Sequence, residues 1–145
     1  MKRSPELMPL SHDHHQALFA AQQLKRAEDP AEALDPFLAF WRTHGRNHFQ
    51  VEEEVLLPGW IVADADADRR LAERVLSEHL EIRGLVWRLE RGDLPLEETH
   101  SLGALLGRHV RFEERELFPA IEAGMDDDAI AELGAEIARA ESVCG

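Results

Sequence analysis

The sequence contains one histidine–glutamate pattern twice. The first copy runs from His48 to Pro58 and the second from His109 to Pro119. In each copy two adjacent glutamates begin four positions after the histidine, and the proline stands ten positions after it. Residues four positions apart on a helix share a face, one turn apart, so the histidine and the first glutamate of each copy present their side chains together. An imidazole nitrogen beside carboxylate oxygens is a set of metal ligands, and the repetition indicates two halves of one site.

The first glutamates of the two copies, Glu52 and Glu113, lie on otherwise apolar helix faces, with Val55 and Leu117 beside them. A carboxylate buried in an apolar bundle is strongly destabilising unless it is paired or coordinated. The chain has 16 basic residues, but few of them fall on these faces, so we expect a metal ion to neutralise the two glutamates. Imidazole and carboxylate ligands together favour iron, manganese or zinc over calcium or copper(I).

Two further predicted helices each carry a histidine near the middle of an apolar face. On the third helix this residue is His79, whereas on the first helix His12, His14 and His15 compete for the position. The helical period favours His14, because it lies on the apolar stripe, while the face of His15 also holds polar residues. The apolar stripe consists of Leu10, Ala17, Leu18, Ala21 and Leu24. A bundle with two-fold pseudo-symmetry would bring all four inward faces to one central point.

Three other residues near the motifs are candidates for supporting roles. Glu53 and Glu114, the second glutamates, point roughly 100° further round the helix than the first. We expect them to support the ligands or to face solvent rather than to bind metal. His44 lies one turn before His48, and we expect a partly buried helix residue there, with a role beside the metal as the alternative.

Apolar residues recur at spacings of three, four and seven along most of the chain, which is typical of helices, and no strand candidate is found. Proline and glycine signals place irregular segments at the start of the chain and after Pro58. The expected helices cover about 11–28, 35–58, 68–91 and 95–119, with irregular segments at 1–10 and 59–67 and a last amphipathic helix at about 126–141. In the segment 59–67, the apolar run of residues 60–62 is expected to pack against the bundle.

These elements predict an all-α fold, an up-down-up-down four-helix bundle with a short C-terminal fifth helix. The length of 145 residues fits one domain covering 1–145, with the bundle core at 10–119. The net charge of −13 argues against binding to nucleic acid or to anionic membranes. No run approaches the roughly 18 apolar residues of a membrane span, and no signal peptide is recognised, so we expect a cytoplasmic protein. Cys144 has no partner for an internal disulfide and is expected to be a solvent-exposed thiol.

The sequence resembles the hemerythrin-like, or HHE cation-binding, family of four-helix bundles. The resemblance covers residues 10–119 and rests on the repeated pattern His-x3-Glu-Glu-x4-Pro. It implies a non-haem centre of two iron ions with oxo or hydroxo and carboxylate bridges, for which manganese or zinc are possible substitutes. It also implies small ligands, dioxygen, nitric oxide or peroxide. Carried over residue by residue, the ligands are His48, His79 and His109, with Glu52 and Glu113 as bridges and His14 or His15 from the first helix.

The chain departs from the oxygen-carrying members of that family at the third helix. They have two histidines one turn apart there, whereas the residue one turn before His79 is Val75. The residue after His48 is Phe49, where some regulatory members have an acidic ligand. The ligand set is therefore one short, so water, His44 or a second histidine of the first helix would fill the open position.

The missing ligand argues against simple reversible oxygen carriage and leaves several other functions open. The main expectation is a protein that binds or senses dioxygen, nitric oxide or iron. The alternative is an enzyme, a di-iron oxidoreductase acting on peroxide or nitric oxide, or an iron donor for iron–sulfur cluster repair. The cysteine-rich N-terminal segment of the cluster-repair relatives is missing, which weakens that last version. The sequence does not predict an oligomeric state.

Overall fold

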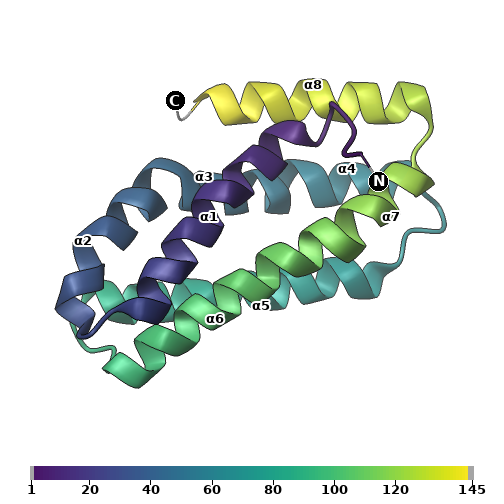
Figure 1. Ribbon diagram of the computed structural model, residues 1–145. Coiled ribbons are helices and arrows are strands. Elements are labelled where there is room, and N and C mark those ends of the chain that lie inside the picture. Colours follow the sequence, from purple (N-terminus) through teal and green to yellow (C-terminus); the bar gives the residue numbers. More distant parts are fainter. Residues whose placement is uncertain (1, 144–145) are drawn as a thin grey trace.

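The computed structural model describes residues 2–143, and these residues form helices and short connections with no strand (Figure 1). Cys144 lies outside the described residues. The helices join into five rods, of which the second and fourth are continuous through several segments. The rods are α1 (Met8–Arg26); the series α2 (Pro30–Phe40), η1 (Trp41–Gly45), α3 (Arg46–Val51), η2 (Glu52–Leu56) and α4 (Leu57–Ala63); α5 (Arg69–Glu90); the series α6 (Leu96–Phe112), η3 (Glu113–Leu117) and α7 (Phe118–Gly124); and α8 (Asp127–Val143).

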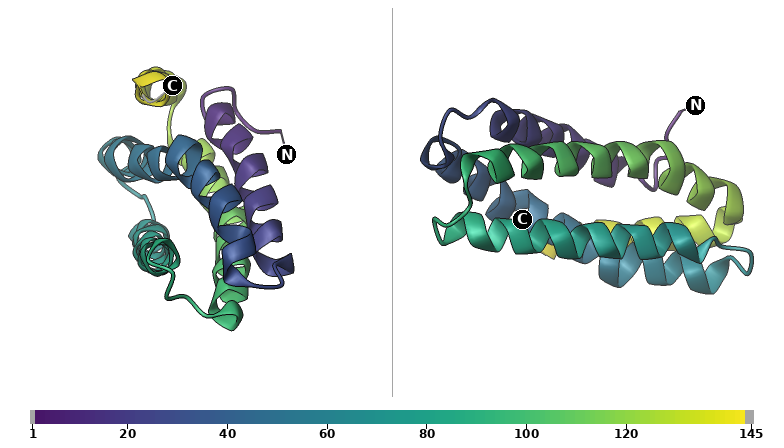
Figure 2. Two further views of the ribbon diagram at one scale, coloured as in Figure 1. Left: turned by 90° about the vertical axis from the view of Figure 1, so that its left-hand side faces the viewer. Right: turned by 90° about the horizontal axis from the view of Figure 1, so that it is seen from below.

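The first four rods run alternately in opposite directions and surround a common axis, while α8 lies along the outside (Figures 1 and 2). The most extensive packing between rods joins α1 to α6, and α8 packs against η2 and α3. The prediction of an all-α bundle with a C-terminal fifth helix is thus confirmed. None of the helices in the described part of the chain has the length and apolar character that a membrane span requires.

Two helix starts predicted from prolines are wrong. The first helix begins at Met8 rather than at residue 11, because Pro9 lies in its first turn, where no backbone N–H is needed. The second begins at Pro30 rather than near residue 35. Asp29 caps it by accepting a hydrogen bond from the backbone N–H of Glu32 at 3.0 Å. A proline therefore opens both helices instead of separating them from a preceding loop.

Two predicted helix ends are also wrong, because the rods continue through Pro58 to Ala63 and through Pro119 to Gly124. A π-helical segment precedes each of these prolines. The backbone N–H of the residue just before the proline donates to a carbonyl five residues back, Leu57 to Glu52 and Phe118 to Glu113. Each proline then falls in the first turn of the next α-helical segment, where its missing N–H leaves no gap. π segments are often found at functional sites.

The expected loop at 59–67 is therefore helical as far as Ala63. Of its apolar run, Trp60 is fully buried, whereas Val62 is 87% exposed. The prediction that the whole run packs against the bundle holds for Trp60 and is wrong for Val62. On a helix, successive residues point about 100° apart, so adjacent apolar residues do not share one environment.

The buried apolar residues form two clusters, one toward each end of the bundle. One cluster contains Leu24, Phe37, Ile82 and Leu102, and the other contains Leu10, Trp60, Val75, Phe118 and Ile137. On each of the first four rods, a buried histidine lies at the boundary between the two clusters. The polar residues at mid-bundle are therefore enclosed by apolar layers above and below, which keeps bulk water away from them.

Candidate metal centre

Six residues of the sequence-predicted set meet at the middle of the bundle. Each is between 0% and 5% exposed. They are His14 on α1, His48 on α3, Glu52 on η2, His79 on α5, His109 on α6 and Glu113 on η3. The first helix turns His14 inward, whereas the side chains of His12 and His15 are exposed. His44 is also exposed, so the expectation of a partly buried residue there is wrong, although His44 lines the small cavity described below.

The six residues form two overlapping groups of four, each of which could hold a metal ion. One group consists of His14, His48, Glu52 and Glu113, and the other of Glu52, His79, His109 and Glu113. Within each group the possible ligand atoms all lie within 4.8 Å of one another. The two glutamates belong to both groups, and each group adds its own pair of imidazoles.

Each shared glutamate presents one oxygen to each group. Oε2 of Glu52 lies 3.0 Å from Nε2 of His48, and its Oε1 lies 3.0 Å from Nε2 of His79. Oε1 of Glu113 lies 2.8 Å from Nε2 of His14, and its Oε2 lies 3.3 Å from Nε2 of His109. The two carboxylates therefore connect the two pairs of imidazoles, which is the arrangement of bridging ligands in a dinuclear site.

The other nitrogen of every imidazole is bound to a carboxylate from a different rod. Each Nδ1 atom donates to the carboxylate, which leaves Nε2 aimed at the centre. The Nδ1 to oxygen distances are 2.6 Å for His14 with Glu114, 2.9 Å for His48 with Asp13, 2.7 Å for His79 with Glu53 and 2.7 Å for His109 with Glu78.

The sequence interpretation identified two of these four carboxylates, Glu53 and Glu114, as candidates for support. It missed the other two, Asp13 and Glu78. A signal for them exists, because each immediately precedes a histidine that faces the centre, in the pairs Asp13-His14 and Glu78-His79. However, neither binds its neighbour in the sequence, because adjacent side chains on a helix diverge. Each reaches a histidine on another rod.

Burial and charge interactions shift the pKa values of several groups at the centre. Burial alone would lower the pKa of His109, but the negative charge of Glu113, whose Oε2 lies 3.3 Å from Nε2 of His109, outweighs this effect and raises the pKa to about 10. Burial likewise opposes the charged form of Glu113, yet the surrounding imidazoles hold its pKa well below the usual value. The pKa of His48 is raised well above its ordinary value, because Glu52 and Asp13 outweigh the effect of burial.

Several polar atoms of the centre have no hydrogen-bond partner in the protein. Nε2 of His48, both oxygens of Glu52 and Oε2 of Glu113 are buried without a hydrogen-bond partner. Moreover, Nε2 of His79 and Nε2 of His109 lie 3.1 Å apart, although both Nδ1 atoms already hold a proton toward a carboxylate. Two nitrogens bound at about 2.1 Å to one ion, at a right angle, lie about 3 Å apart. The donor set and its spacing therefore fit metal cations.

Residues 6–121 match the family model described as the hemerythrin HHE cation binding domain. The chain belongs to this family. No curated protein and no solved structure matches the chain. The matched residues include the six buried histidines and glutamates, so this hemerythrin domain has a buried His/Glu cluster able to hold metal. The helix α8 lies beyond the matched residues.

A small cavity adjoins the centre of this hemerythrin domain. Its volume of about 10 Å³ is about the space that one water molecule occupies. It borders His14, His48, His109 and Glu113 of the cluster. Its remaining walls are mostly apolar and come from Asp13, Ala17, Phe40, His44, Gly45, Phe49, Leu106 and Val110. Only a very small molecule fits beside the centre.

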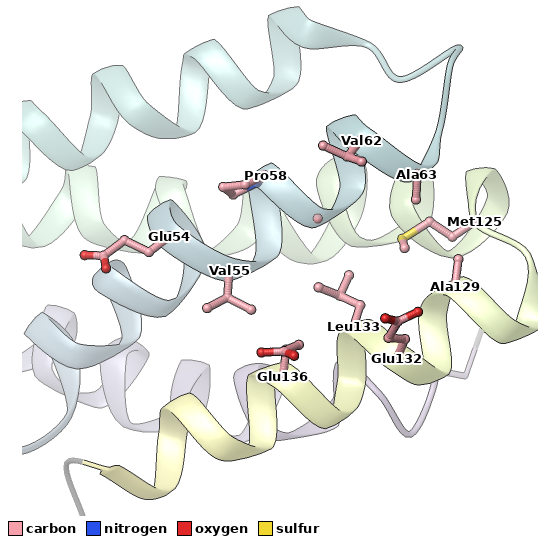
Figure 3. A pocket seen from close by; sticks show the side chains of 11 residues that line it. Glu54, Val55, Pro58, Val62, Ala63, Met125, Ala129, Glu132, Leu133 and Glu136 are labelled. Carbon is pink, nitrogen blue, oxygen red and sulfur yellow. The ribbon is translucent and has the colours of Figure 1, made fainter.

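A separate groove of about 460 Å³ lies between α4 and α8 (Figure 3). Its walls are apolar, with Val55 and Val62 on one side and Leu133 on the other, and glutamates such as Glu54 and Glu132 lie at its edge. None of the six residues of the centre lines it. The groove is therefore separate from the cluster of histidines and glutamates.

Proposed function

We propose that His14, His48, His79 and His109 bind two metal ions as terminal ligands and that Glu52 and Glu113 bridge the ions. The supporting observation is the division of the carboxylate oxygens, because each glutamate directs one oxygen to each pair of imidazoles. Of the two first-helix alternatives, His14 suits this role, since it is buried in the cluster while His15 is exposed.

Iron is the proposed metal. Imidazole and carboxylate ligands suit iron, and dinuclear iron sites with glutamate ligands occur in helix bundles. Manganese and zinc accept the same donor atoms and remain possible substitutes. Each ion would receive two imidazole nitrogens and two carboxylate oxygens, which leaves room for a bridging oxygen and a small exogenous ligand.

The position one turn before His79 does not complete the ligand set. It is occupied by Val75, which is fully buried in an apolar cluster. His44 is exposed and is not one of the six residues that meet at the centre, so an open position on a metal ion would be available to one water molecule or to a small ligand. Two iron ions at such a site would supply reversible binding of small molecules and exchange of electrons with them.

The size and lining of the cavity favour a binding or sensing protein for dioxygen or nitric oxide. The space beside the centre is about 10 Å³, and most of its walls are apolar, which suits a diatomic molecule better than a larger substrate. The chain's own residues would orient the imidazoles through the four Nδ1 hydrogen bonds and exclude bulk water through the apolar layers at both ends.

One observation supports an oxidoreductase acting on peroxide as the second candidate. Asp13 and His44 line the same cavity as the centre and are groups that can accept or donate protons. A reversible spectroscopic change with dioxygen or nitric oxide, without consumption of either, would support the binding function. Consumption of many peroxide molecules per chain would support the enzyme instead.

The first experiment is metal analysis with the visible spectrum of protein from iron-supplemented cells. We expect two irons per chain and the absorption of a bridged ferric pair. The double substitution Glu52→Ala with Glu113→Ala should abolish iron binding while circular dichroism still reports helices. A matched control replaces the exposed glutamates of the same motifs, Glu54 and Glu116, by alanine and should keep the iron. One metal or none in the unsubstituted protein would contradict the proposal.

A further inference from the structure

Helix α5 exposes a row of apolar side chains on its outer side. Six large apolar side chains are exposed in the described part of the chain, and three of them lie on this helix. They are Leu76, Leu80 and Trp87, which are 47%, 74% and 60% exposed. Figure 2 shows α5 at an outer edge of the bundle, with no other helix of residues 2–143 on its outer side. Apolar side chains that gather on one exposed face mark an interaction surface.

The exposed residues on this side follow the spacing of a coiled-coil seam. They recur at alternating intervals of four and three residues from Glu73 to Arg91, the residue that follows α5. The series, here called the α5 seam, consists of Glu73, Ser77, Leu80, Gly84, Trp87 and Arg91. Intervals that average 3.5 residues keep one face of a helix turned toward a second helix over several turns. The spacing therefore favours a helix as the partner of this surface.

The α5 seam contains a glycine that the chain itself does not require. Gly84 lies inside a helix, where glycine is less favourable than alanine. Its φ is not positive, and a Cβ atom at this position would meet nothing within 4 Å. Neither the backbone conformation nor the packing of the chain therefore explains the residue. A glycine on an exposed seam leaves a notch in which a second helix can approach closely.

The sizes of the seam residues are complementary when two copies of α5 run in opposite directions. With a two-fold axis at Ile82, each seam residue faces the residue of the second copy that lies equally far from Ile82 on the other side. Leu80 then faces Gly84 of the second copy, and Trp87 faces Ser77. Each large side chain thus meets a small residue, which is how knobs of one helix enter the holes of another.

The charges fit the same arrangement. At the ends of the α5 seam, Glu73 of each copy faces Arg91 of the other, which places opposite charges together. Residues 69–91 contain six arginines and four glutamates, a net charge of +2, whereas the whole chain carries −13. Two copies that meet at α5 therefore avoid bringing two negatively charged surfaces together.

We propose that the chain forms a homodimer in which two α5 helices pack antiparallel about a two-fold axis at Ile82. The interface is isologous, because each copy contributes the same surface. The seam is about 27 Å long and involves one helix of each copy, which corresponds to the small interfaces of reversible complexes. We therefore expect a dissociation constant in the micromolar range. The small cavity stays uncovered, since none of the residues that line it lies on α5.

The first test measures the mass of the full-length chain by sedimentation equilibrium over a range of concentrations. We expect a reversible equilibrium between monomer and dimer. Trp87 supplies an independent reading, because Trp41 and Trp60 are already buried within one chain. Its fluorescence should shift to shorter wavelength as the chains associate. A chain that stays monomeric at every concentration, or a dimer whose fluorescence does not shift, would overturn the proposal.

Charge reversal tests the antiparallel arrangement. Glu73→Arg places two arginines opposite each other in the homodimer and Arg91→Glu places two glutamates, so each variant alone should dimerise about tenfold more weakly. A mixture of the two variants restores opposite charges at both ends and should associate as strongly as the unsubstituted chain. The matched control is Glu132→Arg, the same change of charge at an exposed position of α8, which should leave dimerisation unchanged. A mixture no stronger than its components would overturn the arrangement.

Gly84→Leu tests the notch. The new side chain meets nothing within its own chain, so the monomer should fold, which circular dichroism verifies. It would occupy the space that Leu80 of the second copy needs, and dimerisation should weaken by about tenfold or more. Unchanged dimerisation of a folded Gly84→Leu chain would show that this notch is not in the interface.

A membrane surface is the competing occupant of the apolar face. If the chain stays monomeric but sediments with phosphatidylglycerol vesicles, and Leu80→Ser abolishes this binding, the second copy is overturned as the partner. All of these measurements are independent of bound metal. The homodimer and the dinuclear site proposed above can therefore be confirmed or rejected separately.

Discussion

Glu53 accepts a hydrogen bond from Nδ1 of His79 at 2.7 Å, while its neighbour Glu52 lies 3.0 Å from Nε2 of the same ring. The second motif repeats this relationship, because Glu113 and Glu114 lie 2.8 and 2.6 Å from the two nitrogens of His14. Two consecutive glutamates thus hold both nitrogens of one imidazole on another rod. The glutamate pair of each motif therefore has two positions, one residue facing the centre and the next bound to Nδ1 of an imidazole.

Glu53→Ala should therefore weaken metal binding without removing a proposed ligand. The imidazole of His79 would lose its acceptor at Nδ1, and we expect the affinity of the His79/His109 half to fall by about 10- to 100-fold. Anaerobic Fe²⁺ titration measures this loss. Glu54→Ala, one position along on the exposed face, serves as the control and should leave the affinity unchanged. Equal affinities for the two variants would show that Glu53 does not act through His79.

The bundle, five of the six buried residues and the choice between His14 and His15 for the sixth could be predicted from the sequence, because they depend on local periodicity. A four-residue spacing places His48 and Glu52 on one face whatever the rest of the chain does. Asp13 and Glu78 could not be assigned, since their partners lie on other rods and depend on how the rods are rotated against each other. The helix ends at Pro58 and Pro119 were misplaced because a π segment lets the helix continue past a proline, and no residue type marks such a segment.

The stability of the metal-free protein should decrease at both extremes of pH. The pKa of His109 is raised from 6.5 to about 10. Its contribution to the free energy of unfolding is therefore complete below its ordinary pKa and is lost as the pH rises through about 10. Burial alone would raise the pKa of Glu114, but hydrogen bonds from His14 and Ser11 lower it from 4.5 to about 2. Its contribution is full above its ordinary pKa and is lost as the pH falls through about 2. Urea unfolding across this pH range measures both effects. A free energy of unfolding that does not change with pH would contradict these contributions of His109 and Glu114.

Metal binding should release protons, because a metal ion replaces the proton on Nε2 of His109. The apparent affinity should therefore rise with pH until the imidazole loses its proton, near its pKa of about 10. Calorimetric titrations in buffers of different ionisation enthalpy count the protons released. An affinity independent of pH, with no proton release, would mean that the imidazoles are already neutral in the metal-free protein.

Two glycines in helical segments should respond oppositely to the same substitution. A Cβ atom at Gly45 would lie 2.8 Å from Cε3 of Trp41 and 2.9 Å from Cε2 of Phe40, whereas one at Gly84 meets nothing within 4 Å. Gly84→Ala should stabilise α5 by about 0.5–1 kcal/mol through helix propensity alone. At Gly45 the same gain is outweighed by overpacking, which typically costs about 1–3 kcal/mol. Urea unfolding of the two variants compares them directly, and stabilisation by Gly45→Ala would show that the aromatic rings move aside easily.

Filling the small cavity should separate ligand binding from metal binding. Ala17 lines the cavity and is not among the proposed ligands, so Ala17→Val should narrow the space beside His14 and His48. We expect two irons per chain and an unchanged resting spectrum, with slower and weaker binding of nitric oxide, because the added methyl groups occupy the space that the ligand needs. Gln16→Val, at the adjacent exposed position of α1, controls for the effect of a β-branched residue on the helix. Unaltered nitric oxide binding in a fully iron-loaded Ala17→Val protein would mean that small ligands reach the metal by another route.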